Sequence, residues 1–342
     1  MIDIRVYNPQ LQLQGLVDTF SSLIWIRRYQ TPGEFELHVP YSERYRELLT
    51  PENIVQRSDG SESTEAGVIE HFEMTGSEIV VKGRFLESYL DRRLIKATTY
   101  YSGNVEDSMR SIISNMVAIP LLELGADHGL EEELTFQATY KSVLSILEKV
   151  CLSTTYGFRI RPDFVARKLY FEVLSGSDLS GAGGPLVVFS ELYDNLLNES
   201  YSYDSTQLKT MAYVNQKIGD NVVAYSTGSG TGLDLREVAV GSNVDTSGRS
   251  TAQIKASMEA YGNEQLATKV VCESFTFNTV DTPFVYRTDF DIGDIVQIRY
   301  SAWGINQSLR VNEAEEDYEN GGRKVILTCG SPLPETVDFE EG

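Results

Sequence analysis

The glycine-rich stretch "STGSGTGLDL", at residues 226–235, has the composition of a loop that could hold a phosphate group. Such loops need a helix N-terminus behind them, so that backbone N–H groups point at the anion. The residues that follow, "LDLREVAVG", instead alternate between apolar and polar side chains as a β-strand does. The sequence therefore predicts the tip of a hairpin here and no nucleotide site.

The three histidines are too dispersed to suggest a metal centre. His38 and His71 fall within predicted strands, and His128 lies in the polar segment "GADHGLEEE". Asp127 and Glu131 stand near His128, but this spacing matches no common ligand set for a transition metal. We therefore expect a solvated acidic loop.

The acidic run "NEAEEDYENGG", at residues 312–322, lacks the alternating ligands and the final glutamate of a calcium loop. Its alternation predicts a strand with one wet face that turns at residues 320–322. No "GxSxG" nucleophile motif occurs, and nothing distinguishes a catalytic pair among fifty acidic residues. We expect no enzymatic activity, no metal and no cofactor.

Cys151, Cys272 and Cys329 lie far apart in the sequence. An odd and scattered set forms neither a disulfide framework nor a zinc site. Because each cysteine has apolar neighbours, we expect three buried free thiols.

Trp303 stands in "YSAWGINQ", at the predicted tip of a hairpin, with Ile305 two residues later. A tryptophan exposed at such a tip is unfavourable in water unless another surface covers it. Two interpretations stay open. Either Trp303 and Ile305 form a contact surface for another protein, or Trp303 packs back onto its own domain.

The chain has 342 residues, of which 50 are acidic and 29 basic, for a formal net charge of −21. Since Lys and Arg provide most of the affinity for nucleic acid and for anionic lipid, sequence-specific nucleic-acid binding and membrane docking are not expected. We also expect no signal peptide and no membrane insertion, because no long apolar stretch occurs. A soluble protein of two to four domains is the expected class.

Hydrophobic periodicity predicts a mainly β fold with an α+β insert. Around "TPG" at residues 31–33 we expect a hairpin, with Phe35, Leu37 and Val39 pointing inward. Helices are expected from residue 105, from residue 140 and over residues 251–267. The predicted domains are a β-barrel at 1–97 with candidate completing strands at 185–225, an α/β insert at 98–182, a β-rich connecting domain at 183–250 and a second barrel at 251–342.

One pattern occurs twice, near the two ends of the chain. "NIVQ" at residues 53–56 is followed by a polar loop and then by the strands "GVIEHFEM" and "SEIVVKGRF". "DIVQ" at residues 294–297 is followed by a loop, "SLRVNEAEED" and "RKVILTCGS". We predict that the two segments have the same strand order and that Val55 and Val296 occupy equivalent core positions.

Several ordered segments, among them "RRYQTPGEFELHVP", "AGVIEHFEMTGSEIVVKGRFLESYLDRRLI" and "DIGDIVQIRYSAWGINQSLRVNEAEE", resemble those of Gp37-like siphovirus tail proteins. That family is similar to the hub proteins at the centre of phage baseplates and of contractile injection machines. The resemblance spans residues 24–334 and carries over no catalytic residue.

The resemblance implies a homotrimer in which each chain carries two barrels of the tail-tube type. Three chains would then present six similar barrels, joining a sixfold tail tube to a threefold spike or tip. It implies as partners a tail tube or distal tail protein, a spike or tip protein and a tape-measure protein. The implied location is the tail tip or baseplate of a virion or tailocin, assembled in a bacterial cytoplasm. A carbohydrate-binding tail-tip module and the scaffold of a cell-wall hydrolase stay open as alternatives.

Overall fold

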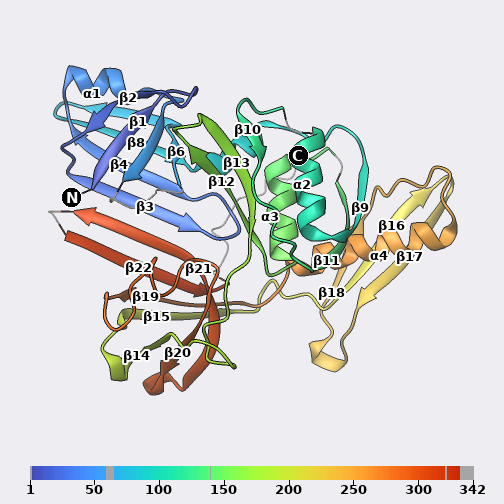
Figure 1. Ribbon diagram of the computed structural model, residues 1–342. Coiled ribbons are helices and arrows are strands. Elements are labelled where there is room, and N and C mark those ends of the chain that lie inside the picture. The colour runs from blue at the N-terminus through green and yellow to red at the C-terminus, as the bar shows by residue number, and fades with distance from the viewer. Residues whose placement is uncertain (1, 59–64, 117, 139, 320–321, 332–342) are drawn as a thin grey trace.

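A ten-stranded sheet, on the left in Figure 1, is the largest sheet among the described residues. The computed structural model describes residues 2–331 apart from 59–64, 117, 139 and 320–321. In order across the sheet, the strands of its main path are β15 (Leu197–Asp204), β19 (Cys272–Thr279), β22 (Gly322–Gly330), β21 (Ile305–Glu319), β3 (Ser22–Arg28), β4 (Glu34–Pro40), β8 (Glu78–Arg84) and β7 (His71–Thr75). The chain is mainly β, as the sequence predicts.

The N-terminal barrel, defined as β1–β8 with helix α1 (Glu43–Leu48), occupies one half of this sheet. A second sheet covers it, made of β2 (Leu13–Val17), β1 (Asp3–Tyr7), β5 (Ile54–Ser58) and β6 (Gly67–Val68). Phe35, Leu37 and Val39 of β4 are buried between the two sheets, because alternate residues of a strand face opposite sides. This confirms the predicted hairpin, since β3 and β4 pair on either side of residues 31–33.

The C-terminal barrel is formed by β15, β19, β21 and β22 together with β14 (Val188–Ser190) and β20 (Ile295–Tyr300). β20 pairs antiparallel with the first part of β21 and parallel with β14. Short 3-10 helices η2 (Glu191–Tyr193) and η4 (Ser301–Trp303) lie beside these strands in the chain.

Residues 185–225 do not complete the N-terminal barrel, so this prediction is wrong. β14 and β15 pair with β20 and β19 instead. The physical reason is an aromatic core: Phe189 of β14 packs on Phe277 of β19, with ring centroids 4.8 Å apart. Both rings are fully buried in the C-terminal barrel.

An α/β unit follows the N-terminal barrel in the chain. Its elements are β9 (Thr99–Asn104), α2 (Val105–Met116), β10 (Leu122–Leu124), β11 (Glu133–Ala138), α3 (Val143–Leu152), β12 (Gly157–Asp163) and β13 (Lys168–Leu174). α2 begins at the predicted residue, and Asn104 caps it by accepting a 2.9 Å hydrogen bond from the N–H of Asp107. α3 begins later than expected, because Ser142 is its cap and Tyr140 is exposed.

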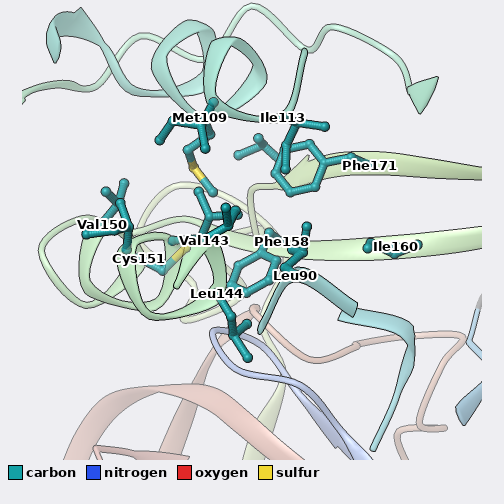
Figure 2. Packing of buried hydrophobic residues seen from close by; sticks show 14 of the residues in the cluster. Leu90, Met109, Ile113, Val143, Leu144, Val150, Cys151, Phe158, Ile160 and Phe171 are labelled. Carbon is teal, nitrogen blue, oxygen red and sulfur yellow. The ribbon is translucent and has the colours of Figure 1, made fainter. Parts of the chain in front are cut away.

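This α/β unit shares its core with the N-terminal barrel. Figure 2 shows Leu90, from the 3-10 helix η1 (Leu86–Arg92), among side chains of α2, α3, β12 and β13. The Tyr29 hydroxyl, just after β3, lies 3.0 Å from the carbonyl oxygen of Thr155 and 2.9 Å from that of Leu174. The sequence predicts a separable insert, but the shared core fixes the unit against the barrel.

The last unit is a three-stranded sheet covered by a long helix, on the far right in Figure 1. Its elements are β16 (Met211–Ile218), β17 (Asn221–Gly228), the 3-10 helix η3 (Gly232–Asp234), β18 (Glu237–Gly241) and α4 (Thr251–Ala267). α4 has the predicted bounds, and Ser250 forms a capping box with Gln253. Met258 of α4 packs on Ala212 and Val214 of β16.

Two predictions about this last unit are wrong. The glycine-rich stretch is not a hairpin tip, because β17 and β18 lie on opposite sides of β16 and the stretch crosses between them. The predicted boundary between residues 250 and 251 separates α4 from the sheet on which it packs. Periodicity identified both elements but could not identify their partners.

Candidate functional site: the junction of the two barrels

The two copies of the repeated module have the same strand order. In the first copy β5 pairs with β6, and β7 pairs with β8. In the second copy the single strand β21 takes the place of β6 and β7: its first part pairs with β20, and its later part pairs with β22. Val55 lies opposite Gly67, and Val296 lies opposite Leu309. Both valines are completely buried, each in the core of its own barrel, which confirms the predicted equivalence.

The equivalence extends to single backbone hydrogen bonds where each module begins. The paired distances are Ile69 N to Asn53 O 2.8 Å and Val311 N to Asp294 O 2.8 Å, then Glu52 N to Ile69 O 2.9 Å and Gly293 N to Val311 O 2.7 Å. Glu52 and Gly293 both have positive φ, at 70° and 93°. A non-glycine residue adopts a positive φ only at a cost in free energy. Its presence at Glu52 as well as at Gly293 therefore indicates that the backbone follows the same path in both copies.

β21 and β3 join the two barrels side by side (Figure 1). Their antiparallel pairing runs from Glu313 opposite Arg28 to Glu319 opposite Ser22. On the core side of this junction Trp25 lies opposite Glu316, and neither side chain is exposed. A carboxylate buried in this way requires cationic partners.

Glu316 has several such partners from different elements. The guanidinium of Arg57, from β5, lies 2.6 Å from its carboxylate, and those of Arg287 and Arg323 each lie 3.0 Å from it. The Tyr318 hydroxyl donates a further bond of 2.6 Å. Burial acts to raise the pKa of Glu316, but Arg287 and Arg57 outweigh burial and hold this pKa at about 2.

A second buried ion pair lies beside the first. Arg27 of β3 is 2.7 Å from Glu65, with 4% and 8% of the two side chains exposed, and it also pairs with Asp291. Arg287 lies 3.3 Å from Glu65, so it links this pair to Glu316. Burial lowers the pKa of Arg27, yet its acidic partners keep that pKa well above the ordinary value. The junction therefore contains one connected network of charges from both barrels.

The opposite face of the ten-stranded sheet, here called the outer face, is rich in carboxylates. Paired strands place these residues on the same side. Its acidic residues include Glu34, Glu36, Glu73, Glu78, Glu313, Glu315, Asp317 and Glu319, and its basic ones Arg28, Lys82, Arg84 and Lys324. Burial, followed by the charges of Asp317 and Glu313, raises the pKa of Glu315 to about 7.

The predicted interface residues have different environments. Ile305 is only 8% exposed and belongs to the core of the C-terminal barrel, so its side chain is not available at the surface. Trp303 is 49% exposed and rests on Tyr300, with ring centroids 4.5 Å apart. Packing on its own barrel therefore covers about half of Trp303, and its contact with another protein stays a prediction.

The remaining predicted residues form no reactive centre in the part of the chain that the structure describes. Cys151 and Cys329 are buried free thiols, as expected, whereas Cys272 is half-buried. Among the described residues no group of three or more His, Cys, Asp or Glu side chains could hold a metal ion. No helix among them is long and apolar enough to cross a membrane.

Sequence reasoning missed the charged network of the junction. The run at residues 312–319 forms the predicted strand with one wet face, and Glu316 points to its dry face. The available signal was the alternation of Ala314, Glu316 and Tyr318, in which an acidic residue takes an inward position between two apolar ones. Part of the predicted turn, at residues 320–321, lies outside the described residues.

Solved structures of phage tail proteins share this fold. A 43 kDa tail protein of prophage MuSo2 from Shewanella oneidensis is 13% identical with a TM-score of 0.57, over 96% of this chain and 98% of that one. A tail protein from Neisseria meningitidis MC58 is 12% identical with a TM-score of 0.60, over 96% of both chains. The lidded Francisella PdpA–VgrG complex contains a chain that is 10% identical with a TM-score of 0.51, over 98% of this chain and 53% of that one.

No curated protein matches the sequence. The fold is that of phage tail proteins. The chain belongs to the Siphovirus ReqiPepy6 Gp37-like protein family, whose profile matches residues 3–331.

Glu316→Gln is expected to destabilise the protein by roughly 3–5 kcal/mol, because it leaves the buried arginines of the junction without their shared carboxylate. Urea unfolding followed by tryptophan fluorescence measures this, since Trp25 lies in the junction. The control is Glu319→Gln, at the exposed end of the same strand, with an expected change within about 0.5 kcal/mol. Equal effects of the two variants would contradict the assigned role of Glu316.

Glu315→Gln is expected to raise the melting temperature at about pH 8 and to leave it unchanged near pH 5. The folded-state pKa of Glu315 is about 7, above its ordinary value of 4.5, so the folded protein binds a proton there that the unfolded chain does not. The stability that this proton contributes is therefore present below about pH 4.5, decreases as the pH rises from 4.5 to 7, and is absent above 7. A difference between variant and wild type that is the same at both pH values would rule out this titration.

Proposed function

We propose that the protein is a structural hub of a phage tail or baseplate, acting as a homotrimer. In this proposal each chain supplies two consecutive segments of a ring with near-sixfold symmetry. The ring joins a sixfold tail tube or distal tail protein to a threefold spike or tip protein. One observation carries the proposal: β21 and β3 hold two copies of the same strand order side by side in one sheet.

We further propose that the outer face of the sheet lines a central channel. Its carboxylates outnumber its basic residues, and the whole chain has a net charge of −21. Such a wall repels phosphate, so DNA could pass without being held, and the tape-measure protein could pass the same way. The charge also argues against sequence-specific nucleic-acid binding as the function.

The proposed oligomer is tested by the mass of the purified protein, measured by light scattering alone and after mixing with its tail-tube neighbour. We expect a particle with three times the 38.3 kDa mass of the chain. A chain that stays monomeric in both conditions, or that forms an even-numbered particle, contradicts the proposed hub.

A structural role without catalysis predicts no lytic activity. The described residues contain neither a metal-ligand group nor a phosphate loop backed by a helix, and the sequence has no nucleophile motif. Zymography of the pure protein on bacterial cell walls is expected to show no clearing, with a known lysozyme as the positive control. A lytic band that comigrates with the protein would support the hydrolase-scaffold alternative instead.

A further inference from the structure

The main path of the ten-stranded sheet ends in two strands that have no partner on their outer side among the described residues. These strands are β7 in the N-terminal barrel and β15 in the C-terminal barrel. Each half of the sheet has the same order: β3-β4-β8-β7 in one and β15-β19-β22-β21 in the other. β15 is therefore the counterpart of β3, and β7 is the counterpart of the later part of β21. The two free edges correspond to the two strands that pair at the junction.

The strand pairings also fix which residues correspond. Val55 pairs with Gly67, and its counterpart Val296 pairs with Leu309, so Gly67 and Leu309 correspond. Four residues further along each segment, His71 corresponds to Glu313. The residues of the other strands correspond in the same way. Phe35 and Phe275 lie opposite Gly83 and Cys329. Trp25 is opposite Phe35, and Tyr201 is opposite Phe275, so Tyr201 takes the place of Trp25.

Applying the register of the junction to the free edges gives a specific set of opposed residues. They are His71 with Asp204, Phe72 with Tyr203, Glu73 with Ser202, Met74 with Tyr201, and Thr75 with Ser200. Beyond Ser200 the register of β15 is irregular, so the match covers five positions. Five residues also make up the whole of β7.

The core-side residues of this set are apolar and exposed. Met74, Tyr201 and Tyr203 have 48%, 37% and 58% of their surface accessible. Their counterparts at the junction are Glu316, Trp25 and Arg27, of which at most 4% is exposed. Exposed aromatic and thioether side chains at the edge of a sheet favour association with another strand. Positions that are buried at the junction are therefore exposed at the two free edges.

One outer-face pair has complementary hydrogen-bonding groups. At the junction, Arg28 of β3 lies 2.7 Å from Glu313 of β21. At the free edges the two positions are held by Asp204 of β15 and His71 of β7. An imidazole N–H donates to a carboxylate, so this opposed pair suits a hydrogen bond across the proposed contact.

We propose that β7 of one copy pairs antiparallel with β15 of the next copy, in the register given above. This inference rests on the proposed function, because it specifies the contact by which the ring closes. The contact is heterologous: β7 and β15 are different surfaces, so successive copies join head to tail. The main path of the ten-stranded sheet then continues from chain to chain, and both of its edge strands are paired.

The test is a disulfide between engineered cysteines at Glu73 and Ser202, on the full-length protein. At the junction the N–H of Tyr29 donates to the carbonyl of Asn312, 3.0 Å away, so Arg28 and Glu313 form a non-hydrogen-bonded pair. Such pairs alternate along the strands, which makes Glu73 and Ser202 a pair of the same type, with close side chains. Mild oxidation of Glu73→Cys/Ser202→Cys should give covalent species of two and then three chains.

The matched control is Glu73→Cys/Tyr203→Cys. It moves one cysteine by a single position along β15, to the opposite face of the sheet, where no disulfide can form. The wild-type chain, whose cysteines are all free, gives the background from native thiols. We expect more than tenfold more cross-linked product from the first variant than from the control.

The outcomes separate this inference from the ring itself. A trimer by mass that does not cross-link, or that cross-links equally in the control, overturns the β7–β15 contact and leaves the ring standing. Cross-linked species that continue beyond three chains support the contact but overturn the closed trimer. A chain that neither associates nor cross-links overturns both.

Discussion

The antiparallel pairing of β21 with β3 joins strands that lie almost 300 residues apart in the sequence, and the arrangement of the two barrels depends on it. Main-chain hydrogen bonds make the connection, but they do not by themselves select one register. A slip of one residue would turn Glu316 to the outer face and leave Arg57 buried without its carboxylate. The buried charges therefore specify the register, which is a role that such networks can have even where their net contribution to stability is small.

The junction contains buried charges, whereas the free edges carry apolar side chains. This difference is expected if the junction forms during folding and the proposed contact between copies forms later, at assembly. Within one chain the charged groups of the junction are buried as the protein folds, and each finds its partners at short distance. A contact between copies must instead remove its groups from water at assembly. Met74, Tyr201 and Tyr203 lose little hydration on burial, whereas Glu316 or Arg27 in the same places would lose much. Buried charges therefore suit a contact that forms during folding, and apolar side chains suit the proposed contact between copies.

The sequence predicts the parts of this fold that local patterns determine. The repeated "IVQ" modules, the inward face of β4 and the bounds of α4 all depend on residues close together in the chain. Pairing over long distances could not be predicted in the same way. β15 pairs with β19 across the whole unit of β16–β18 and α4, and β17 and β18 flank β16 from opposite sides. Periodicity shows that a strand has a buried face, but not which strand lies beside it. The network around Glu316 was not predicted for a related reason, because its partners Arg57 and Arg287 come from distant segments.

In the proposed ring, the two equivalent barrels of each chain form successive segments. Electron microscopy of the purified particle, viewed along its axis, tests this most directly. Such a ring should give class averages with six similar densities around a central opening, related by exact threefold and approximate sixfold symmetry. Class averages in which each chain contributes one ring segment, or in which no central opening exists, would contradict it.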